Sequence, residues 1–290
     1  MFVNIIVLLV PSQMYYLNMV KNNIDNKKLE VSQGNKIAYF EIISDKSNIG
    51  IILIHGLAEH KGRYIEFIHQ LHSLNYSVFA LDLIGHGESS GKKGDLNNFT
   101  EYVDELGKFV FHIRKTYPLM KIGLFGHSLG GLVACSYTSE HNGNVDFLIL
   151  SNPLLERKKI LNIFYFLPYK LLGFIKTKKR HSESKEMLEY SRRDPLACKF
   201  MTLRLLGEIF ITGINYNRKR LPYIETPVLL LGGSEDNLTN SRNLKNIINH
   251  FGSKDKTLKI YDGIKHRLVH SVKKEEVIKD ISVWINERIK

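Results

Sequence analysis

The chain has 290 residues, of which 43% are hydrophobic and 24% are charged, so it is long and apolar enough to bury a full core. Its formal net charge is +12, but residues 152–222 alone hold 16 Lys or Arg against 6 Asp or Glu. Because this basicity is local and no DNA- or RNA-binding motif accompanies it, we expect no nucleic-acid partner. The two cysteines make no disulfide framework, and the absence of a His/Cys cluster predicts no metal and no cofactor.

The first residues resemble neither a complete membrane span nor a secretion signal. Phe2–Val10 is apolar but much too short to cross a bilayer. It lacks a positively charged flank before it and a small-residue cleavage site after it, which disfavours a signal peptide. Met14 and Met19 follow closely. We therefore assign residues 1–27 to an N-terminal extension, either disordered or upstream of the true start, and expect a cytoplasmic protein.

Along most of the remaining chain, apolar strand patterns alternate with amphipathic helix patterns. Strands are predicted in a hairpin over 28–43 and then over 50–55, 77–82, 121–125, 145–150, 227–232 and 257–261. Helices are predicted over 62–74, 99–117, 129–140, 240–251 and 273–289. This alternation predicts an α/β fold, a mostly parallel sheet with helices on both faces.

One long segment interrupts the alternation. Residues 152–226 contain no clear strand–helix unit, and their apolar and basic stretches are interleaved. We interpret them as a helical cap, or lid, inserted between two parts of one core, residues 28–151 and 227–290. The chain therefore has a single α/β domain with an insertion.

A short sequence between a strand and a helix marks the candidate nucleophile. Gly126–Gly130 reads GHSLG, a G-x-S-x-G motif preceded by an apolar strand and followed at once by a helix. A serine at such a turn has a strained backbone and an exposed hydroxyl, and the flanking glycines allow neighbouring chain to approach. Gly87–Gly91 also matches the motif, but a polar loop follows it. The context therefore selects Ser128 over Ser89.

A serine hydroxyl needs a general base to become a nucleophile, and the base needs a carboxylate to orient it. In an open α/β sheet these groups lie beyond the carboxyl ends of strands. Glu235 and Asp236 follow one late strand, and His266 and His270 follow the last. Either acid and either histidine satisfies this placement. The order Ser, acid, His is the order expected for this kind of fold.

The reaction also needs two backbone N–H groups to bind the oxyanion of the tetrahedral intermediate. One comes from the residue after the nucleophile, Leu129, at the N-terminus of a helix. The other must come from a loop after an early strand, and His55-Gly56-Leu57 ends such a strand. The N–H groups of Leu57 and Leu129 are therefore the candidate oxyanion donors.

Beyond these single features, much of the chain from about residue 30 resembles the monoacylglycerol lipases and the related proteins called lysophospholipases, apart from most of the cap. The most specific match is the stretch HGLAEHKGRY at His55–Tyr64. The others are DLIGHGES at 82–89, GHSLG at 126–130, RDPL at 193–196, GSED at 233–236 and DKTLKIYDG at 255–263. The resemblance implies an α/β-hydrolase fold with a cap.

The resemblance also implies roles for individual residues. It makes Ser128 the nucleophile, Asp236 the acid and His266 the base. Glu59 and Arg63 match residues near the polar end of the family's pocket, so it implies substrate binding for both. A further histidine in the family lies three residues after the catalytic one, whereas this chain has Val269 there and His270 next to it.

We therefore expect a serine hydrolase that cleaves carboxylic esters of single-acyl-chain lipids through an acyl-enzyme. A lysophospholipase, a thioesterase or a general carboxylesterase would use the same triad. An aminopeptidase is less favoured, because the cap shows no acidic cluster to bind an amino terminus. A hydrolase-fold protein without catalytic activity is the alternative from another class, and an intact set of Ser128, Asp236 and His266 argues against it.

The cap also predicts where a lipid substrate could enter. Its apolar stretch at 160–175 is followed directly by the basic run Lys176–Arg180. This arrangement is typical of a segment that contacts an anionic membrane surface, so we expect peripheral membrane contact as one function of the cap. A cap helix packed on the core with a solvated basic rim explains the same pattern equally well.

Overall fold

The computed structural model describes residues 24–32, 34–156, 169, 176–178, 194–239 and 243–289. The apolar segment at 2–10, the expected extension up to residue 23 and most of the expected cap, including 160–168, lie outside the described residues.

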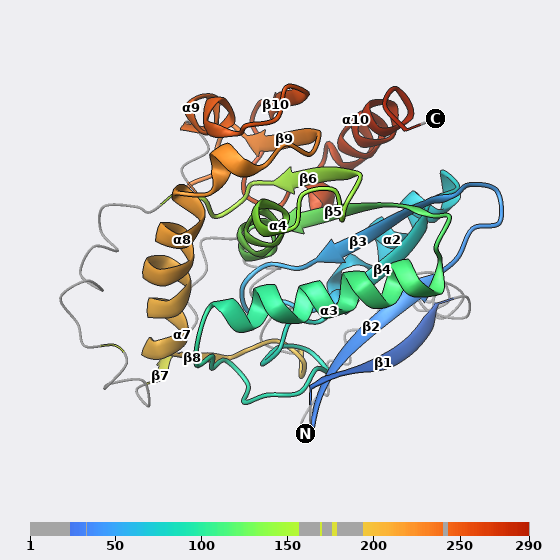
Figure 1. Cartoon of the computed structure of the whole chain (residues 1–290). Helices are drawn as coiled ribbons and strands as arrows, with labels where there is room; N and C mark the ends of the chain where they lie inside the picture. Colours follow the sequence, from blue (N-terminus) through green and yellow to red (C-terminus); the bar gives the residue numbers. More distant parts are fainter. Residues whose placement is uncertain are drawn as a thin grey trace, which may run out of the picture.

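Eight strands form one sheet in the order β1-β2-β4-β3-β5-β6-β9-β10 (Figure 1). β1 and β2 are antiparallel to their neighbours, and all other neighbouring strands, from β4 to β10, are parallel. The strands are β1 (Asp25–Ser32), β2 (Asn35–Ile42), β3 (Ile49–Ile54), β4 (Ser77–Leu81), β5 (Lys121–His127), β6 (Phe147–Ser151), β9 (Val228–Gly233) and β10 (Lys256–Tyr261). The predicted α/β fold is confirmed.

Helices cover both faces of this sheet (Figure 1). Ile52 and Ile54 of β3 belong to the same buried cluster as the inner faces of α3 (Thr100–Thr116) and α4 (Leu129–Glu140). Ile51 and Leu53 belong to a second cluster, with α2 (Ile65–Ser73) and α10 (Lys274–Asn286). Successive side chains of a strand point to opposite faces. The central strand is buried on both sides for this reason, which explains its continuous apolar sequence.

Most predicted elements lie within a few residues of their observed bounds, and the differences have local causes. β1 begins at Asp25 rather than 28, because residues 25–27 continue the ladder by pairing with Glu41, Phe40 and Tyr39. The helix predicted over 62–74 begins with a 3-10 turn, η1 (Lys61–Tyr64), before α2. The helix predicted over 240–251 is described as α9 (Leu244–Ile247) and the 3-10 turn η6 (Ile248–His250).

The described part of the expected cap contains both helix and strand. β7 (Lys176–Lys178) and β8 (Phe200–Thr202) pair antiparallel, which the sequence did not predict. A continuous helical run follows, made of α7 (Leu203–Gly207), the π-helical η3 (Glu208–Gly213) and α8 (Ile214–Arg218). The run ends at Arg218, and the 3-10 turn η4 (Leu221–Tyr223) lies between it and β9.

Asp95, in the loop before α3, fixes the start of this helical run to the core. Its carboxylate accepts a hydrogen bond from the Thr202 hydroxyl at 2.7 Å. The Arg204 guanidinium binds both of its oxygens, at 3.1 and 2.6 Å. The pKa of Asp95 is lowered to about 2, because these hydrogen bonds outweigh the cost of burial.

Candidate active site

Ser128 occupies the sharp turn between β5 and α4. Its backbone has φ 53° and ψ −111°, a conformation that is strained for any residue other than glycine. A Cβ on Gly126 would come within 2.5 Å of the Gly130 carbonyl oxygen, and one on Gly130 within 2.1 Å of the Ile54 carbonyl oxygen. Both glycines are therefore required for the turn, and the Ser128 side chain remains partly exposed.

Asp236 and His266 form a direct contact beyond the ends of β9 and β10. The Asp236 Oδ2 lies 2.8 Å from the His266 Nδ1. The carboxylate also accepts hydrogen bonds from the Leu238 N–H at 2.7 Å and the Thr239 hydroxyl at 2.5 Å. Burial raises the pKa of Asp236, but the hydrogen bonds from His266, Thr239 and Leu238 outweigh the effect of burial and lower the pKa to about 2. An ionised Asp236 makes His266 Nδ1 the donor and leaves His266 Nε2 as the acceptor.

The other two candidates from the sequence are placed differently. Glu235 is exposed at the surface of the same loop. His270 lies in the 3-10 turn η7 (Leu268–His270), where its Nε2 lies 2.8 Å from the Arg63 carbonyl oxygen. Its ring also packs against Tyr64, with 5.2 Å between the ring centroids. The geometry therefore pairs Asp236 with His266 and gives His270 a contact with η1.

Asn152, which the sequence analysis missed, holds the histidine loop beside the elbow. Its Nδ2 donates to the His266 carbonyl oxygen at 2.7 Å, and its Oδ1 accepts from the Gly233 N–H at 3.0 Å. Asn152 directly follows β6 and has φ 44°. The sequence signal that could have identified Asn152 is an asparagine directly after a predicted strand and before Pro153. Asn152 ties the ends of β6 and β9 to the loop that carries His266.

Ser128 and His266 thereby meet at the same edge of the sheet. His127, the residue before the serine, packs on His266 with 4.7 Å between ring centroids. The pKa of His127 is lowered to about 3 by burial and by the neighbouring His266. No hydrogen bond joins the Ser128 hydroxyl to the His266 ring among the described residues. Such contacts are often long in free enzymes and shorten when substrate binds.

The two expected oxyanion donors come from the segments on either side of Ser128. Leu129 is the first residue of α4, and the close approach of Gly130 to the Ile54 and His55 carbonyl oxygens packs this turn against the end of β3. Leu57 follows on the loop that leaves β3 and is partly buried. Ala58, next to it, has φ 60°, a strained left-handed backbone. This strained residue therefore lies in the same loop as Leu57.

Glu59 is engaged by several protein groups. It is 4% exposed. Its carboxylate accepts from the Gly56 N–H at 3.2 Å and the Tyr64 hydroxyl at 2.7 Å, and lies 2.6 Å from the Arg267 guanidinium. Burial opposes its ionisation, but Arg267 and the other neighbours outweigh that effect and hold the pKa of Glu59 well below its usual range.

Arg63 is likewise bound to another part of the protein. Its Nε and Nη2 donate to the Asp194 Oδ2 at 3.1 and 2.9 Å. His60 contacts the same oxygen at 2.8 Å. Asp194 belongs to the expected cap, so both core residues fix the cap to the loop that follows β3. Glu59 and Arg63, for which substrate binding is expected from the sequence, thus both take part in internal ion pairs.

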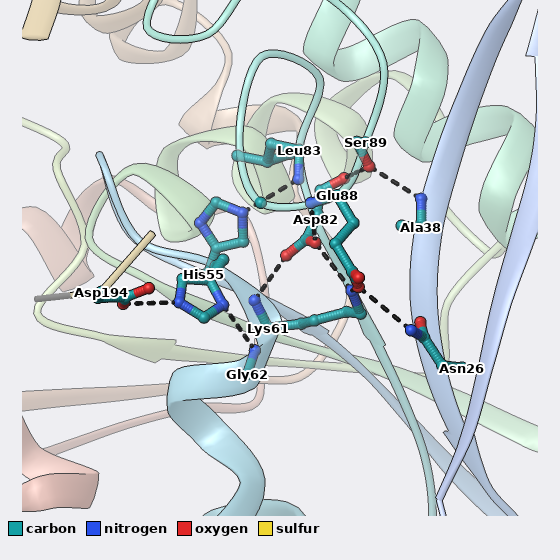
Figure 2. A network of polar contacts seen from close by, with 12 residues as sticks. Asn26, Ala38, His55, Lys61, Gly62, Asp82, Leu83, Glu88, Ser89 and Asp194 are labelled. Carbon is teal, nitrogen blue, oxygen red and sulfur yellow. Dashed lines mark hydrogen bonds and ion pairs between the residues drawn. The ribbon is translucent and has the colours of Figure 1, made fainter. Parts of the chain in front are cut away.

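The second G-x-S-x-G sequence has a structural role (Figure 2). The Ser89 hydroxyl donates to the Asp82 carbonyl oxygen at 2.6 Å and accepts from the Ala38 N–H at 2.9 Å. Ser89 is buried by these contacts. Ser89 thus links the loop that follows β4 to strand β2. Because its hydroxyl is buried and bonded on both sides, it is unavailable as a nucleophile.

Two further observations concern the described part of the chain alone. It contains no group of three or more His, Cys, Asp or Glu side chains arranged to hold a metal ion. No helix within it has the length and apolar character needed to cross a membrane.

Comparisons with known proteins identify the family of this chain. Residues 46–272 match the family described as serine aminopeptidase, S33. The monoglyceride lipase of Homo sapiens is 31% identical over 252 residues, which cover 82% of each chain. The monoglyceride lipase homolog of Monkeypox virus is 29% identical over 280 residues, covering 92% of this chain and 98% of that protein.

A solved structure extends the comparison to the fold. A soluble variant of the monoglyceride lipase from Saccharomyces cerevisiae, in complex with a substrate analog, superposes with a TM-score of 0.77 at 20% sequence identity. The alignment covers 91% of this chain and 96% of that one. The chain therefore belongs to the serine aminopeptidase S33 family of α/β-hydrolases and is a serine ester hydrolase of the monoacylglycerol lipase type.

Proposed function

We propose that this protein hydrolyses monoacylglycerols and related single-chain esters, with Ser128, Asp236 and His266 as its catalytic triad. The observation that carries the proposal is the 2.8 Å contact between Asp236 and His266, beside a serine at a strained strand-to-helix turn. The similarity to monoglyceride lipases supports the choice of substrate.

The proposed reaction has two steps. His266 Nε2 removes the Ser128 proton as the hydroxyl oxygen attacks the ester carbonyl, and Asp236 stabilises the imidazolium that forms. The N–H groups of Leu57 and Leu129 bind the oxyanion of the tetrahedral intermediate. His266 then donates its proton to the departing glycerol oxygen, leaving an acyl group on Ser128. Water activated by His266 hydrolyses this acyl-enzyme by the reverse proton transfers.

Glu59 and Arg63 have a positioning role in this proposal. Glu59 joins the loop carrying Leu57 to Arg267, the neighbour of His266. Arg63 joins the end of the same loop to Asp194 in the cap. Neither side chain needs to touch the substrate for its loss to affect the reaction.

The domain division supports this arrangement. We assign the core to residues 25–151 and 227–290, because β1 begins at Asp25 rather than at residue 28, and the cap to 152–226. Six strands of the sheet, β1 to β6, precede the insertion, and β9 and β10 follow it. The contacts of His60 and Arg63 with Asp194, and of Asp95 with Arg204, support a cap over the carboxyl edge where the triad is proposed.

A substrate panel with a nucleophile variant tests the function. Purified protein is assayed with monoacylglycerols of several chain lengths, a lysophospholipid, an acyl thioester and short p-nitrophenyl esters. We expect the largest kcat/KM with a monoacylglycerol, and loss of all activities in Ser128→Ala. A preference for the lysophospholipid or the thioester would show that the proposed substrate class is wrong, but it would leave the proposed triad in place. Turnover that survives in Ser128→Ala would overturn the triad.

As a further part of the proposal, we infer that the cap makes peripheral contact with an anionic membrane, because its sequence is both apolar and basic. Lys176 and Lys178 belong to β7, within the basic run 176–180, and an apolar stretch precedes them in the sequence. Each basic side chain near an anionic surface contributes roughly 1 kcal/mol of attraction. We expect tighter sedimentation with anionic than with zwitterionic vesicles, weakened by salt and by Glu substitutions at 176, 178, 179 and 180. Equal sedimentation with both vesicles would contradict membrane contact.

A further inference from the structure

The loop that presents Leu57 is fixed at both ends to residues that directly follow β4. At its first residue, the His55 Nε2 accepts a hydrogen bond from the Leu83 N–H at 3.0 Å (Figure 2). The His55 Nδ1 therefore carries the proton, and it donates to the Gly56 carbonyl oxygen at 2.7 Å. The pKa of His55 is lowered by burial, which keeps the ring neutral and this pair of hydrogen bonds intact.

At the other end of the loop, Asp82 binds Lys61 twice. The Asp82 Oδ1 accepts from the Lys61 backbone N–H at 2.6 Å, and the Oδ2 accepts from the Lys61 ammonium at 2.9 Å (Figure 2). The Oδ2 also accepts from the Glu88 N–H at 2.8 Å. A Cβ on Gly87 would lie 2.1 Å from this oxygen, so glycine is required for the loop to wrap the carboxylate.

Lys61 is an unusual lysine because almost none of it reaches solvent. It is 1% exposed, and its partner Asp82 is 0% exposed. The ammonium also contacts the Glu88 carboxylate at 2.5 Å and lies 4.6 Å from the centre of the Phe40 ring. Glu88 is 35% exposed and is itself held by Asn26. Lys61 is thus the countercharge of a fully buried carboxylate, with a second, more exposed carboxylate on its outer side.

The backbone between these two anchors stores strain. Ala58 has φ 60° and lies directly after Leu57. A residue other than glycine keeps such a conformation only where its surroundings hold it. If the anchor at Lys61 were released, Ala58 would be free to relax to a negative φ, and the loop that carries the Leu57 N–H would lose its fixed path between His55 and Lys61.

We propose that Lys61 is a positioning residue for the oxyanion hole, acting through Asp82 on the loop that carries the Leu57 N–H. The inference rests on the proposed function, in which Leu57 is an oxyanion donor. Lys61 holds Asp82 ionised and in place, and Asp82 holds the Lys61 backbone N–H. The ammonium touches neither substrate nor Ser128, so its effect on the reaction is transmitted by the loop.

The test replaces Lys61 by methionine, which keeps the length of the side chain and removes its charge. Kinetics are measured with p-nitrophenyl butyrate and scaled to the folded fraction from circular dichroism. An oxyanion donor acts in the transition state rather than in the substrate complex. We therefore expect Lys61→Met to lower kcat by about 10- to 100-fold while KM changes less than about threefold. Lys27→Met, which removes a half-exposed lysine of β1 from its pair with the buried Glu41 of β2, is the matched control and should keep kcat within about twofold.

A transition-state analogue provides a readout that loss of stability alone would not move. A trifluoromethyl ketone forms a tetrahedral adduct with the active-site serine, and its oxygen occupies the oxyanion hole. Its inhibition constant should rise by the same factor as kcat/KM falls in Lys61→Met. An unchanged kcat, a loss seen only in KM, or an unchanged inhibition constant would each overturn the proposal.

The outcomes remain decisive if Lys61→Met does not fold. Lys61→Gln keeps a hydrogen-bond donor near Asp82 without the charge, and it should show a smaller loss of kcat of about 3- to 10-fold. Wild-type kcat in folded Lys61→Gln would overturn the proposal. A wild-type protein that hydrolyses no ester would instead contradict the proposed function, so the two failures are distinguishable.

Discussion

Glu59 and Arg267 are joined by a largely buried ion pair, with 2.6 Å between the Glu59 Oε1 and the Arg267 Nη2. Glu59 belongs to the loop after β3, and Arg267 directly follows His266. The same carboxylate also holds the Gly56 N–H and the Tyr64 hydroxyl. The pair therefore connects the segment that carries Leu57 to the segment that carries the candidate base, across the turn at Ser128.

Replacing Arg267 by methionine should destabilise the protein. The substitution leaves Glu59 buried without its guanidinium partner, and breaking a buried pair in this way costs about 3 kcal/mol. Denaturant unfolding should show this loss in Arg267→Met, whereas Glu66→Gln should change the free energy of unfolding by less than about 0.5 kcal/mol. Glu66 is the matched control because it pairs with Lys274 at the surface.

Glu59→Gln distinguishes a positioning role from direct binding of a substrate head group. Positioning predicts equal losses of kcat/KM with a monoacylglycerol and with a p-nitrophenyl ester of the same acyl chain, because both use the same oxyanion hole. Direct binding of glycerol predicts a loss with the monoacylglycerol alone. Steady-state kinetics with the two substrates decide between these roles.

The two serines of the G-x-S-x-G sequences should respond in opposite ways. Ser128→Ala should retain the stability of the wild type and lose activity by about 10⁶-fold. Ser89→Ala should keep the chemistry, but it leaves the buried Ala38 N–H without its acceptor, so the free energy of unfolding should fall by about 1–3 kcal/mol. Measurements of ester hydrolysis and of thermal unfolding on both variants check these two expectations. A stable but inactive Ser89→Ala would show that the elbow has been assigned to the wrong serine.

Much of the fold follows from the sequence because its signals are local. Buried parallel strands such as β3 read as continuous apolar runs, and the G-x-S-x-G motif around Ser128 directly joins a strand to the helix that follows it. The turn that carries the candidate nucleophile is predictable for the same reason. Helix and strand ends were less certain, because they depend on ladder partners, as at Asp25.

The parts of the site that residue types and strand positions alone leave open depend on contacts between distant segments. Residue types alone allow Glu235 or Asp236, and only the path of the loop after β9 brings Asp236 to His266. The role of Asn152 depends on two loops meeting at the ends of β6 and β9. Lysine is normally a surface residue, so the burial of Lys61 against Asp82 has no signal in the sequence.

Asp236 should give the protein a specific sensitivity to acid. Its pKa in the folded protein is about 2, below the ordinary value of 3.8, so the unfolded chain binds the proton at higher pH than the folded chain does. The stabilisation is therefore complete above about pH 4 and is lost as the pH falls toward 2. A shift of this size corresponds to about 2 kcal/mol.

Chemical denaturation between pH 2 and pH 6 measures this contribution. Asp236→Asn removes the titrating group, so the difference in stability between wild type and variant should shrink as the pH falls below about 4. Glu235→Gln, at the exposed neighbouring position, should follow the wild type at every pH. A constant difference between wild type and Asp236→Asn over this range would contradict the assignment of the ion pair to Asp236 and His266.

Asp194 should control how the protein handles long acyl chains. Its Oδ2 is bound by His60 at 2.8 Å and by the Arg63 Nη2 at 2.9 Å, which fixes the cap to the loop after β3. A long acyl chain needs the cap in place along its length, whereas a two-carbon acyl group reaches only Ser128 and the oxyanion hole. Asp194→Ala should therefore raise KM for a long-chain monoacylglycerol about tenfold, roughly 1.4 kcal/mol of binding. Turnover of p-nitrophenyl acetate should stay within about twofold, and Asp262→Ala, at an exposed aspartate bound to Ser234, should leave both substrates unaffected. Equal losses on both substrates would instead mean that Asp194 acts on the oxyanion loop rather than on the acyl chain.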